Sequence, residues 1–289
     1  LHNPAHSFPT RRSSDHPLIV HVANQAGVAR FAAEVPAFAG RLIDAFWPGP
    51  LTLILPRRPG MAEAAAGGHP TVGLRCPAHP VAHALLAACA ERGVHGLAAP
   101  SANRFGRVSP TTAAHVVSEF QDTLDEQQLV VLDGGPCQVG IESTIIDCSR
   151  GHPVLLRPGM LTPAQLEAAA GQPLRARDEQ APRASGTLES HYAPQAKVRL
   201  MDAGQIQSAL DVLGADARHI AIYSRARLRS ASRHLLLREM PAQADACAQE
   251  LFAVLRGFDD AGVRLIWIET PPPDTAWDGV RDRLQRAAA

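Results

Sequence analysis

Lysine is almost absent from this chain of 289 residues, and its absence excludes one class of nucleotide site. Lys197 is the only lysine, so the other 27 basic residues are arginine. A phosphate-binding loop of the G-x-x-x-x-G-K-[ST] type needs an ammonium group to reach the β- and γ-phosphates. Any phosphate site in the first 196 residues must therefore use arginine, hydroxyl or backbone N–H groups.

Long apolar runs and an excess of charge of one sign are also missing. Apolar stretches such as 18–22 and 51–55 fall far below the roughly 18 residues that a spanning helix needs. The chain has 28 basic and 28 acidic residues, with no block of five like charges, and so lacks the electrostatic footprint of non-specific nucleic-acid binding. We predict no membrane segment and expect any RNA partner to meet a local patch.

Cysteine and histidine patterns disfavour metal sites and disulfides. The five cysteines are odd in number, widely spaced and never in C-x-x-C, which suits reduced thiols in the cytoplasm. His79 and His83 have the spacing of paired zinc ligands, but the glutamate of H-E-x-x-H is absent between them. No serine or cysteine triad stands out. We therefore predict neither a bound metal nor a covalent nucleophile.

Two regions of regular structure are predicted, with a linker between them. Residues 1–15 show no helical or strand periodicity and begin with leucine, so we expect an irregular, non-native start and a chain whose true beginning is missing. Strand-like runs alternate with helical stretches over 16–171, which predicts a sheet-centred domain. Pro, Arg, Ser and Gly dominate 172–196, as in a linker, and 197–289 predicts a smaller α/β domain. The strand-like runs are 18–22, 51–55, 71–75, 129–133, 143–147, 153–157, 198–201, 221–223, 234–237 and 264–269.

Start and stop signals mark several helices. Thr162 as N-cap, Gln165 at the capping-box position and Gly171 past the end bound one helix. Another begins at Pro80 and stops before Gly93. We expect its buried face to carry Val81, Leu85, Ala88 and Cys89. In the longest predicted helix, over 242–258, a single apolar stripe is typical of a core face.

Small polar residues gather where strands should give way to helices. Ser101 and Asn103 follow the strand-like GLAA, and Ser109 precedes a helix start. Hydroxyl, amide and N–H groups at such ends suit a phosphate, although Ser109 is also explained as an N-cap and the other two as turn residues. Arg75 and Arg157, at the ends of strand-like runs, are either surface cations or planar forks for phosphate and carboxylate.

Six segments of the chain follow one another in a distinctive order: HPLIVHV, FWPGPLTLIL, TVGLRCPAHP, LAAPSANRFGRVSPT, LDGGPCQVGIESTIID and LLRPGMLT. In this order they resemble the YrdC-like family of threonylcarbamoyl-AMP synthases. The combination of S-x-N, G-x-x-S-T and L-R-P-G is specific, and the similarity spans about 16–171. SGTLESHYAP and the terminal VRDRLQRAA resemble the long, two-domain form. The implied fold is a twisted mixed sheet with surrounding helices, plus a smaller C-terminal Rossmann-like α/β domain.

The resemblance implies an activity and its binding residues. Members of the family condense ATP, which carries Mg²⁺, with L-threonine and bicarbonate into threonylcarbamoyladenylate and pyrophosphate. This is the first half of making threonylcarbamoyladenosine at position 37 of tRNAs in the cytoplasm, so the downstream transferase machinery and tRNA itself are candidate partners. No tightly bound cofactor is implied. The motifs imply ATP contacts at Arg12, His16, Thr71, Ser101, Asn103, Ser109, Arg157 and Tyr192. They imply L-threonine contacts at His21, Arg75, Ala99 and Ser143.

The N-terminus departs from the family pattern. The usual P-T-[ED]-T-x-Y-G-L segment has no equivalent, and Thr10 stands at the lysine position of the K-x-R motif that Arg12 completes. We therefore expect an N-terminally truncated chain with impaired activity. The alternative function is a non-catalytic RNA-binding module of the same fold, which zero net charge and scarce aromatics disfavour.

Overall fold

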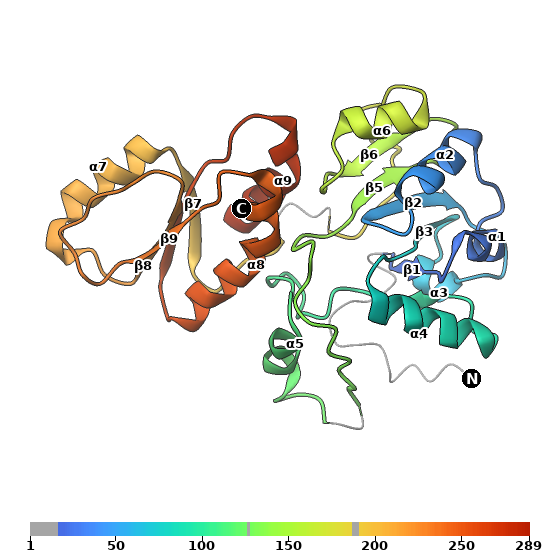
Figure 1. Ribbon diagram of the computed structural model, residues 1–289, viewed down its shortest axis with the longest axis horizontal. Helices are drawn as coiled ribbons and strands as arrows, with labels where there is room; N and C mark the ends of the chain where they lie inside the picture. The colour runs from blue at the N-terminus through green and yellow to red at the C-terminus, as the bar shows by residue number, and fades with distance from the viewer. Residues whose placement is uncertain (1–16, 126–127, 187–190) are drawn as a thin grey trace. The chain divides into compact units, whose positions relative to one another are not determined.

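The computed structural model describes residues 17–125, 128–186 and 191–289, which form two compact units (Figure 1). The described residues of the first unit are 17–105, 112–136 without 126–127, and 142–186. Those of the second are 106–111, 137–141 and 191–289. Two short segments of the N-terminal half thus belong with the C-terminal unit. The domain boundaries predicted above rest on composition and motifs, and they stay predictions.

The first unit is built on a six-stranded mixed sheet with the order β4-β1-β3-β2-β5-β6. β1 is parallel to β3 and β2 to β5, whereas the other three pairs are antiparallel. The strands are β1 (Ile19–His21), β2 (Leu51–Pro56), β3 (Thr71–Arg75), β4 (Leu97–Ala98), β5 (Thr144–Asp147) and β6 (Val154–Arg157). The helices are α1 (Val28–Phe31), α2 (Ala37–Phe46), α3 (Glu63–Ala66), α4 (Pro80–Glu91), α5 (Ala113–Phe120) and α6 (Pro163–Ala170), with the 3₁₀ turn η2 (Gln25–Gly27).

Alternation of side chains along the strands gives this sheet two different faces. On one face, Leu53 and Leu74 of the strands pack against Leu42 of α2 and Leu166 of α6, all four fully buried. The opposite face carries a smaller apolar cluster around Ile54, together with most of the polar side chains of the strands. The main core therefore lies between the sheet and the helices, and the polar side chains that could bind a ligand lie on the second face.

One helix of the first unit follows its sequence signals closely. The Thr162 hydroxyl accepts from the Gln165 N–H (3.3 Å), and the Gln165 side chain accepts from the Thr162 N–H (2.9 Å), which completes the predicted capping box. Gly171 ends α6 with φ at 66°, in the left-handed region where glycine carries no steric penalty. Local chemistry alone defines both ends of this helix.

The predicted strand at 129–133 is wrong. These residues lie outside the strands of the described chain, and Val130 and Leu132 are 75% and 58% exposed. β-branched and apolar residues favour a strand only where a neighbouring strand or a core receives them. The run has the propensity for a strand but no strand to pair with.

Two further expectations about helices are wrong. α5 begins after Thr112, whose hydroxyl accepts from the His115 N–H (3.2 Å), so Ser109 is not its N-cap. In α4 the buried side chain is Leu86, whereas Val81 and Leu85 are 37% and 41% exposed. α4 is rich in alanine, so its sequence favours no single face strongly, and packing selects one.

The second unit has a four-stranded parallel sheet with the order β7-β10-β8-β9. One face packs on α7 through Ile206 and Leu210, and the other receives α8, whose predicted stripe is buried at Cys247 and Leu251. This arrangement confirms the smaller α/β domain. Its strands are β7 (Lys197–Met201), β8 (Ile220–Ser224), β9 (Leu236–Glu239) and β10 (Leu265–Glu269). Its helices are α7 (Ala203–Leu213), α8 (Ala244–Asp260) and α9 (Asp278–Ala288), with 3₁₀ turns η3 (Gly214–Asp216) and η4 (Thr275–Trp277).

The described residues of 172–196 contact the rest of the chain: the earlier ones contact the first unit and the later ones the second. Arg175 N–H donates to the Pro153 carbonyl (2.9 Å), and Ala184 is buried in the apolar cluster of the first unit. Further on, His191 N–H donates to the Arg286 carbonyl (3.2 Å) of α9 in the second unit. This stretch carries contacts although its composition is that of a linker.

Candidate active site

Residues predicted from the sequence gather on the second face of the first unit's sheet. Strand register pairs His21 with Arg75, and Ile145 with Arg157, and residues paired in this way point to the same face. The register across β1, β3, β2 and β5 places Ile19, Ile54 and Ile145 on one face of the sheet. The His21–Arg75 pair and the Ile145–Arg157 pair therefore both lie on this face. This is the face opposite the helices α1, α2 and α6.

Four of the predicted residues also lie at the same end of the strands, and we call this row of strand ends the edge of the sheet. β1 and β3 end at His21 and Arg75, β6 ends at Arg157, and Ser143 immediately precedes β5. The register places these strand ends together with the first residues of β2. Two guanidinium groups, a hydroxyl and an imidazole are therefore presented side by side, at the junction of five strands.

Arg157 and Ser143 are joined directly. Arg157 Nε donates to the Ser143 carbonyl (3.0 Å), its Nη2 to the Ser143 hydroxyl (3.2 Å) and its Nη1 to the Ser185 carbonyl (2.8 Å). Both side chains are buried, and the Ser143 Oγ lies 2.7 Å from the Thr52 Oγ1 on β2. The buried Arg157 guanidinium is therefore in direct contact with Ser143, whose hydroxyl is paired with that of Thr52.

Arg75 and His21 form the other part of this edge. Arg75 Nε donates to the Gly49 carbonyl (3.1 Å), and the Gly49 N–H donates to the carbonyl of Cys76 (2.9 Å), so the turn before β2 holds the end of β3. Burial, followed by the positive charge of Arg75, lowers the pKa of His21 to about 4. His21 is therefore a neutral imidazole at pH 7, able to accept or donate one hydrogen bond.

The remaining predicted residues of the first unit lie further along the same sheet. Thr71 begins β3 and pairs with Pro56, which puts it at the opposite edge from Arg75 but on the same face. Ala99 follows β4, and its N–H donates to the Ile19 carbonyl (3.1 Å). Ser101 and Asn103 occupy the loop after β4; Asn103 is buried, and its amide donates to the Arg104 carbonyl (2.8 Å). The structure therefore does not bring Thr71 to the end of β3 that carries Arg75.

Two predicted nucleotide contacts belong to the second unit. Ser109 is buried, and the Arg256 guanidinium of α8 donates to the carbonyls of Ser109 and Val108. Tyr192 is buried with φ at 62°, its ring packing on Phe252 with 5.3 Å between ring centroids and lying 5.5 Å from the Arg283 guanidinium. The last two predicted contacts, at positions 12 and 16, lie outside the described residues.

Two family models together match nearly the whole chain. The model described as "Telomere recombination", for Sua5, YciO and YrdC proteins, matches residues 10–159. The model described as "Threonylcarbamoyl-AMP synthase, C-terminal domain" matches residues 161–289. The threonylcarbamoyl-AMP synthase of Bacillus subtilis (strain 168) is 35% identical over 294 aligned residues, covering 96% of this chain and 80% of that protein. The chain belongs to the threonylcarbamoyl-AMP synthase family.

A second relative supports this membership in both sequence and structure. The threonylcarbamoyl-AMP synthase of Pyrococcus abyssi (strain GE5 / Orsay) is 32% identical, covering 96% of this chain and 81% of that protein. The crystal structure of P. abyssi Sua5 complexed with L-threonine is similar with a TM-score of 0.82 at 31% identity, covering 95% of this chain and 81% of that one. The two-domain synthase architecture inferred from the sequence motifs is thereby confirmed.

Neither Thr52 nor the turn at Gly49 is singled out by the sequence patterns above, and both contact residues of the candidate site. Thr52 is the single hydroxyl in the apolar run LTLIL, and a lone polar residue inside a buried strand is a signal that a partner exists. Gly49 has no room for a side chain, because a Cβ there would lie 2.2 Å from the Phe46 carbonyl oxygen. Both lie in the family-like segment FWPGPLTLIL without having been assigned a contact; Thr52 contacts the predicted Ser143, and Gly49 contacts the predicted Arg75.

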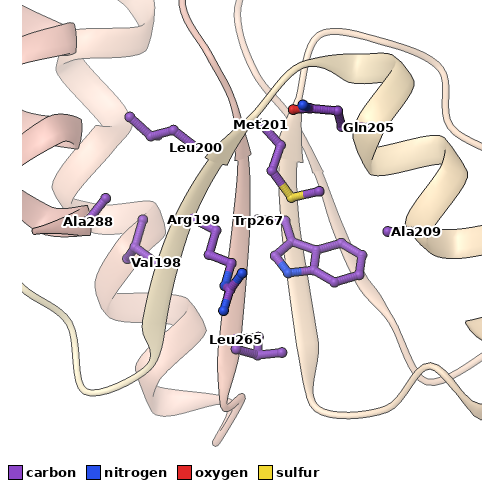
Figure 2. A pocket seen from close by; sticks show the side chains of 9 residues that line it. All are labelled: Val198, Arg199, Leu200, Met201, Gln205, Ala209, Leu265, Trp267 and Ala288. Carbon is purple, nitrogen blue, oxygen red and sulfur yellow. The ribbon is translucent and has the colours of Figure 1, made fainter.

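A hollow of about 630 Å³ in the second unit has none of the described residues predicted for the synthase site in its lining (Figure 2). It wraps around β7, with Arg199 and the Trp267 indole on one side of the sheet and Val198 and Ala288 on the other. Its lining carries one cation and no carboxylate, imidazole or thiol. This lining provides no group for acid–base or nucleophilic chemistry.

Metal-ligand clusters and membrane-spanning helices are both missing among the described residues. These residues contain no group of three His, Cys, Asp or Glu side chains placed to hold a metal ion. No helix among them is long and apolar enough to cross a membrane.

Proposed function

We propose that this chain makes L-threonylcarbamoyladenylate from ATP, L-threonine and bicarbonate. The threonine amine and bicarbonate give a carbamate with loss of water. A carbamate oxygen then attacks the α-phosphorus of ATP, and the bond to the β-phosphate oxygen breaks to release pyrophosphate. The observation that carries the proposal is the sheet edge with Arg75, Arg157 and Ser143 in a member of this family.

The residues at this edge suit such a reaction because it needs positioning and charge neutralisation more than a protein nucleophile. Two guanidinium groups offset the charge of phosphate and carboxylate oxygens in a partly dry site, where each contact is stronger than in water. The neutral His21 adds a hydrogen bond without a further charge. A hydroxyl at Ser143 completes a set that orients small anionic groups.

We assign the binding residues by motif, and the register of the sheet supports part of the assignment. The proposed L-threonine contacts are His21, Arg75, Ala99 and Ser143, three of which share the same edge. The proposed ATP contacts at Arg12, His16, Ser109 and Tyr192 rest on motif resemblance alone. The other proposed ATP contacts are Thr71, Ser101, Asn103 and Arg157.

The proposed function also implies the ion and the partners of the reaction. Mg²⁺ would arrive with ATP, held by the triphosphate oxygens. The product is an activated adenylate for transfer to position 37 of tRNA, so a tRNA threonylcarbamoyl transferase would consume it. The described cysteines are all free thiols, which suits a reducing compartment such as the cytoplasm.

Pyrophosphate release tests the function directly. With ATP, L-threonine and bicarbonate all present, we expect pyrophosphate and a threonine-containing adenylate in equal amounts, and neither when L-threonine is left out. D-threonine provides a matched substrate control. Release that ignores L-threonine would refute the proposal, and tight tRNA binding without any adenylate would favour the RNA-binding module instead.

We further propose that the chain is slower than relatives that carry the lysine of K-x-R. Thr10 stands at that position and lies outside the described residues. A threonine hydroxyl cannot replace a positive charge near a triphosphate. The deficit would be one of rate and ATP affinity, with the fold intact.

A further inference from the structure

Thr52 lies at the centre of the edge that holds Ser143 and Arg157. It is fully buried on β2, where its register partner is Ile145, so it points to the same sheet face as Ser143. Its Oγ1 is 2.7 Å from the Ser143 Oγ. In the part of the chain that the structure describes, this is the single hydrogen-bond partner of the Thr52 hydroxyl.

The donors and acceptors around Ser143 limit how this pair can be arranged. Arg157 can only donate, so the Ser143 oxygen accepts from its Nη2. The Ser143 hydroxyl has one proton, which goes either to Thr52 or to another group. If it went to Thr52, the Thr52 proton would be left without an acceptor at a fully buried position, which is costly.

The reverse arrangement leaves the free proton on the Ser143 hydroxyl, which is also buried (2% exposed) but lies at the strand ends to which the proposed function assigns L-threonine. When Thr52 donates to Ser143, the serine oxygen accepts from both Thr52 and Arg157. The Ser143 proton then points away from both and needs an oxygen acceptor from outside the pair. A carboxylate or carbamate oxygen of a bound substrate supplies one, so binding would complete the set of hydrogen bonds.

We propose that Thr52 is a positioning residue that turns the Ser143 hydroxyl into a donor for an oxygen of L-threonine. The inference rests on the proposed function, which places L-threonine beside Ser143. Thr52 itself does not touch the substrate. Its effect is therefore expected on one substrate only, and any residue that keeps the hydroxyl should preserve it.

Binding of L-threonine and of ATP to the full chain, measured separately by calorimetry, tests the proposal without depending on turnover. Thr52→Val keeps the branched shape and removes the hydroxyl. We expect it to weaken L-threonine binding about three- to tenfold, the range of one neutral hydrogen bond, and to leave ATP binding within about twofold. Thr52→Ser should restore L-threonine affinity to within about twofold of the parent chain.

Ser143→Ala separates this inference from the proposed function. If the parent chain does not bind L-threonine, or if Ser143→Ala binds it normally, the proposed site assignment fails. If Ser143→Ala weakens binding and Thr52→Val does not, only the role of Thr52 is overturned.

The remaining outcomes also decide the role of Thr52. Tighter L-threonine binding by Thr52→Val would mean that Ser143 donates to Thr52. Equal losses for both ligands, or no rescue by Thr52→Ser, would indicate a structural role and overturn the proposal. Failure of both Thr52→Val and Thr52→Ala to fold would assign the hydroxyl to the fold and overturn it as well.

Discussion

Replacing Arg157 by lysine should separate the geometry of its guanidinium from its charge. The arginine uses three nitrogens on three acceptors, the Ser143 carbonyl, the Ser143 hydroxyl and the Ser185 carbonyl, at 2.8 to 3.2 Å. It is 2% exposed, so water cannot replace these contacts. A lysine ammonium keeps the charge but donates from a single nitrogen, and it cannot reach the carbonyls of Ser143 and Ser185 together.

The magnitude follows from the contacts that lysine abandons. A hydrogen bond from a charged donor contributes about 1.5–3 kcal/mol, and a buried carbonyl left without a donor costs about 1–3 kcal/mol. The contacts of Arg157 form one network, so these figures do not add in full. We expect Arg157→Lys to lower the free energy of unfolding by about 2–4 kcal/mol, and to weaken ATP binding by about 1.5–3 kcal/mol.

Urea denaturation and ATP titration of the same preparation measure the two effects of Arg157→Lys. Arg175→Lys is the matched control in the same unit, because the Arg175 side chain is exposed; its stability should stay within about 0.5 kcal/mol. An unchanged urea midpoint for Arg157→Lys would refute the reasoning from geometry. Lost stability with unchanged ATP affinity would make Arg157 a structural residue only.

Three further predictions concern other parts of the chain. A Cβ at Gly140 would lie 2.1 Å from the Gln249 carbonyl oxygen, so Gly140→Ala should lower the free energy of unfolding by about 1–3 kcal/mol, measured by thermal unfolding. Gly257 lies on open helix surface, so Gly257→Ala is the control and should not destabilise the chain. Equal melting temperatures for the two variants would contradict this prediction. The pKa of His21 is about 4 in the folded chain and 6.5 in the unfolded chain. The stability that its neutral form contributes is therefore complete above pH 6.5 and is lost as the pH falls toward 4, which lowers the free energy of unfolding by up to about 3 kcal/mol. His21→Gln should flatten the stability profile between pH 7 and 4, and an unaltered slope would exclude this role. Thr10→Lys should raise the rate of pyrophosphate release about 10²-fold if the missing cation limits turnover, and an unchanged rate would show that it does not.

The helix at Pro163–Ala170 and the strand at 129–133 show where sequence patterns succeed and fail. The ends of the helix depend on groups within a few residues of each other, so Thr162 and Gly171 could be recognised from local chemistry. A strand depends on a partner that is distant in the sequence. Residues 129–133 have suitable side chains but no partner, and Val130 is left 75% exposed.

The same distinction between local patterns and distant partners applies to the residues of the candidate site. Arg157 and Ser143 were singled out because they end or precede strand-like runs and match specific motifs. Thr52 lies in the family-like segment FWPGPLTLIL but was assigned no contact, and its hydrogen bond to Ser143 (2.7 Å) is visible only in the structure. Ser109 was a reasonable N-cap by sequence, but Thr112 lies closer to the first turn of α5 and takes that role.

The sequence by itself determined the α/β class, most strands and helices, the family and the residue types of the candidate site, because each of these depends on short-range patterns or on motifs. The tertiary structure alone decided which face of each element is buried, which segments of the N-terminal half join the C-terminal unit, and which side chains touch. The physical reason is that burial and hydrogen bonding depend on what packs against a residue. Leu86, rather than Val81 or Leu85, is buried in α4 because the neighbours of that helix, and not its own periodicity, select the face.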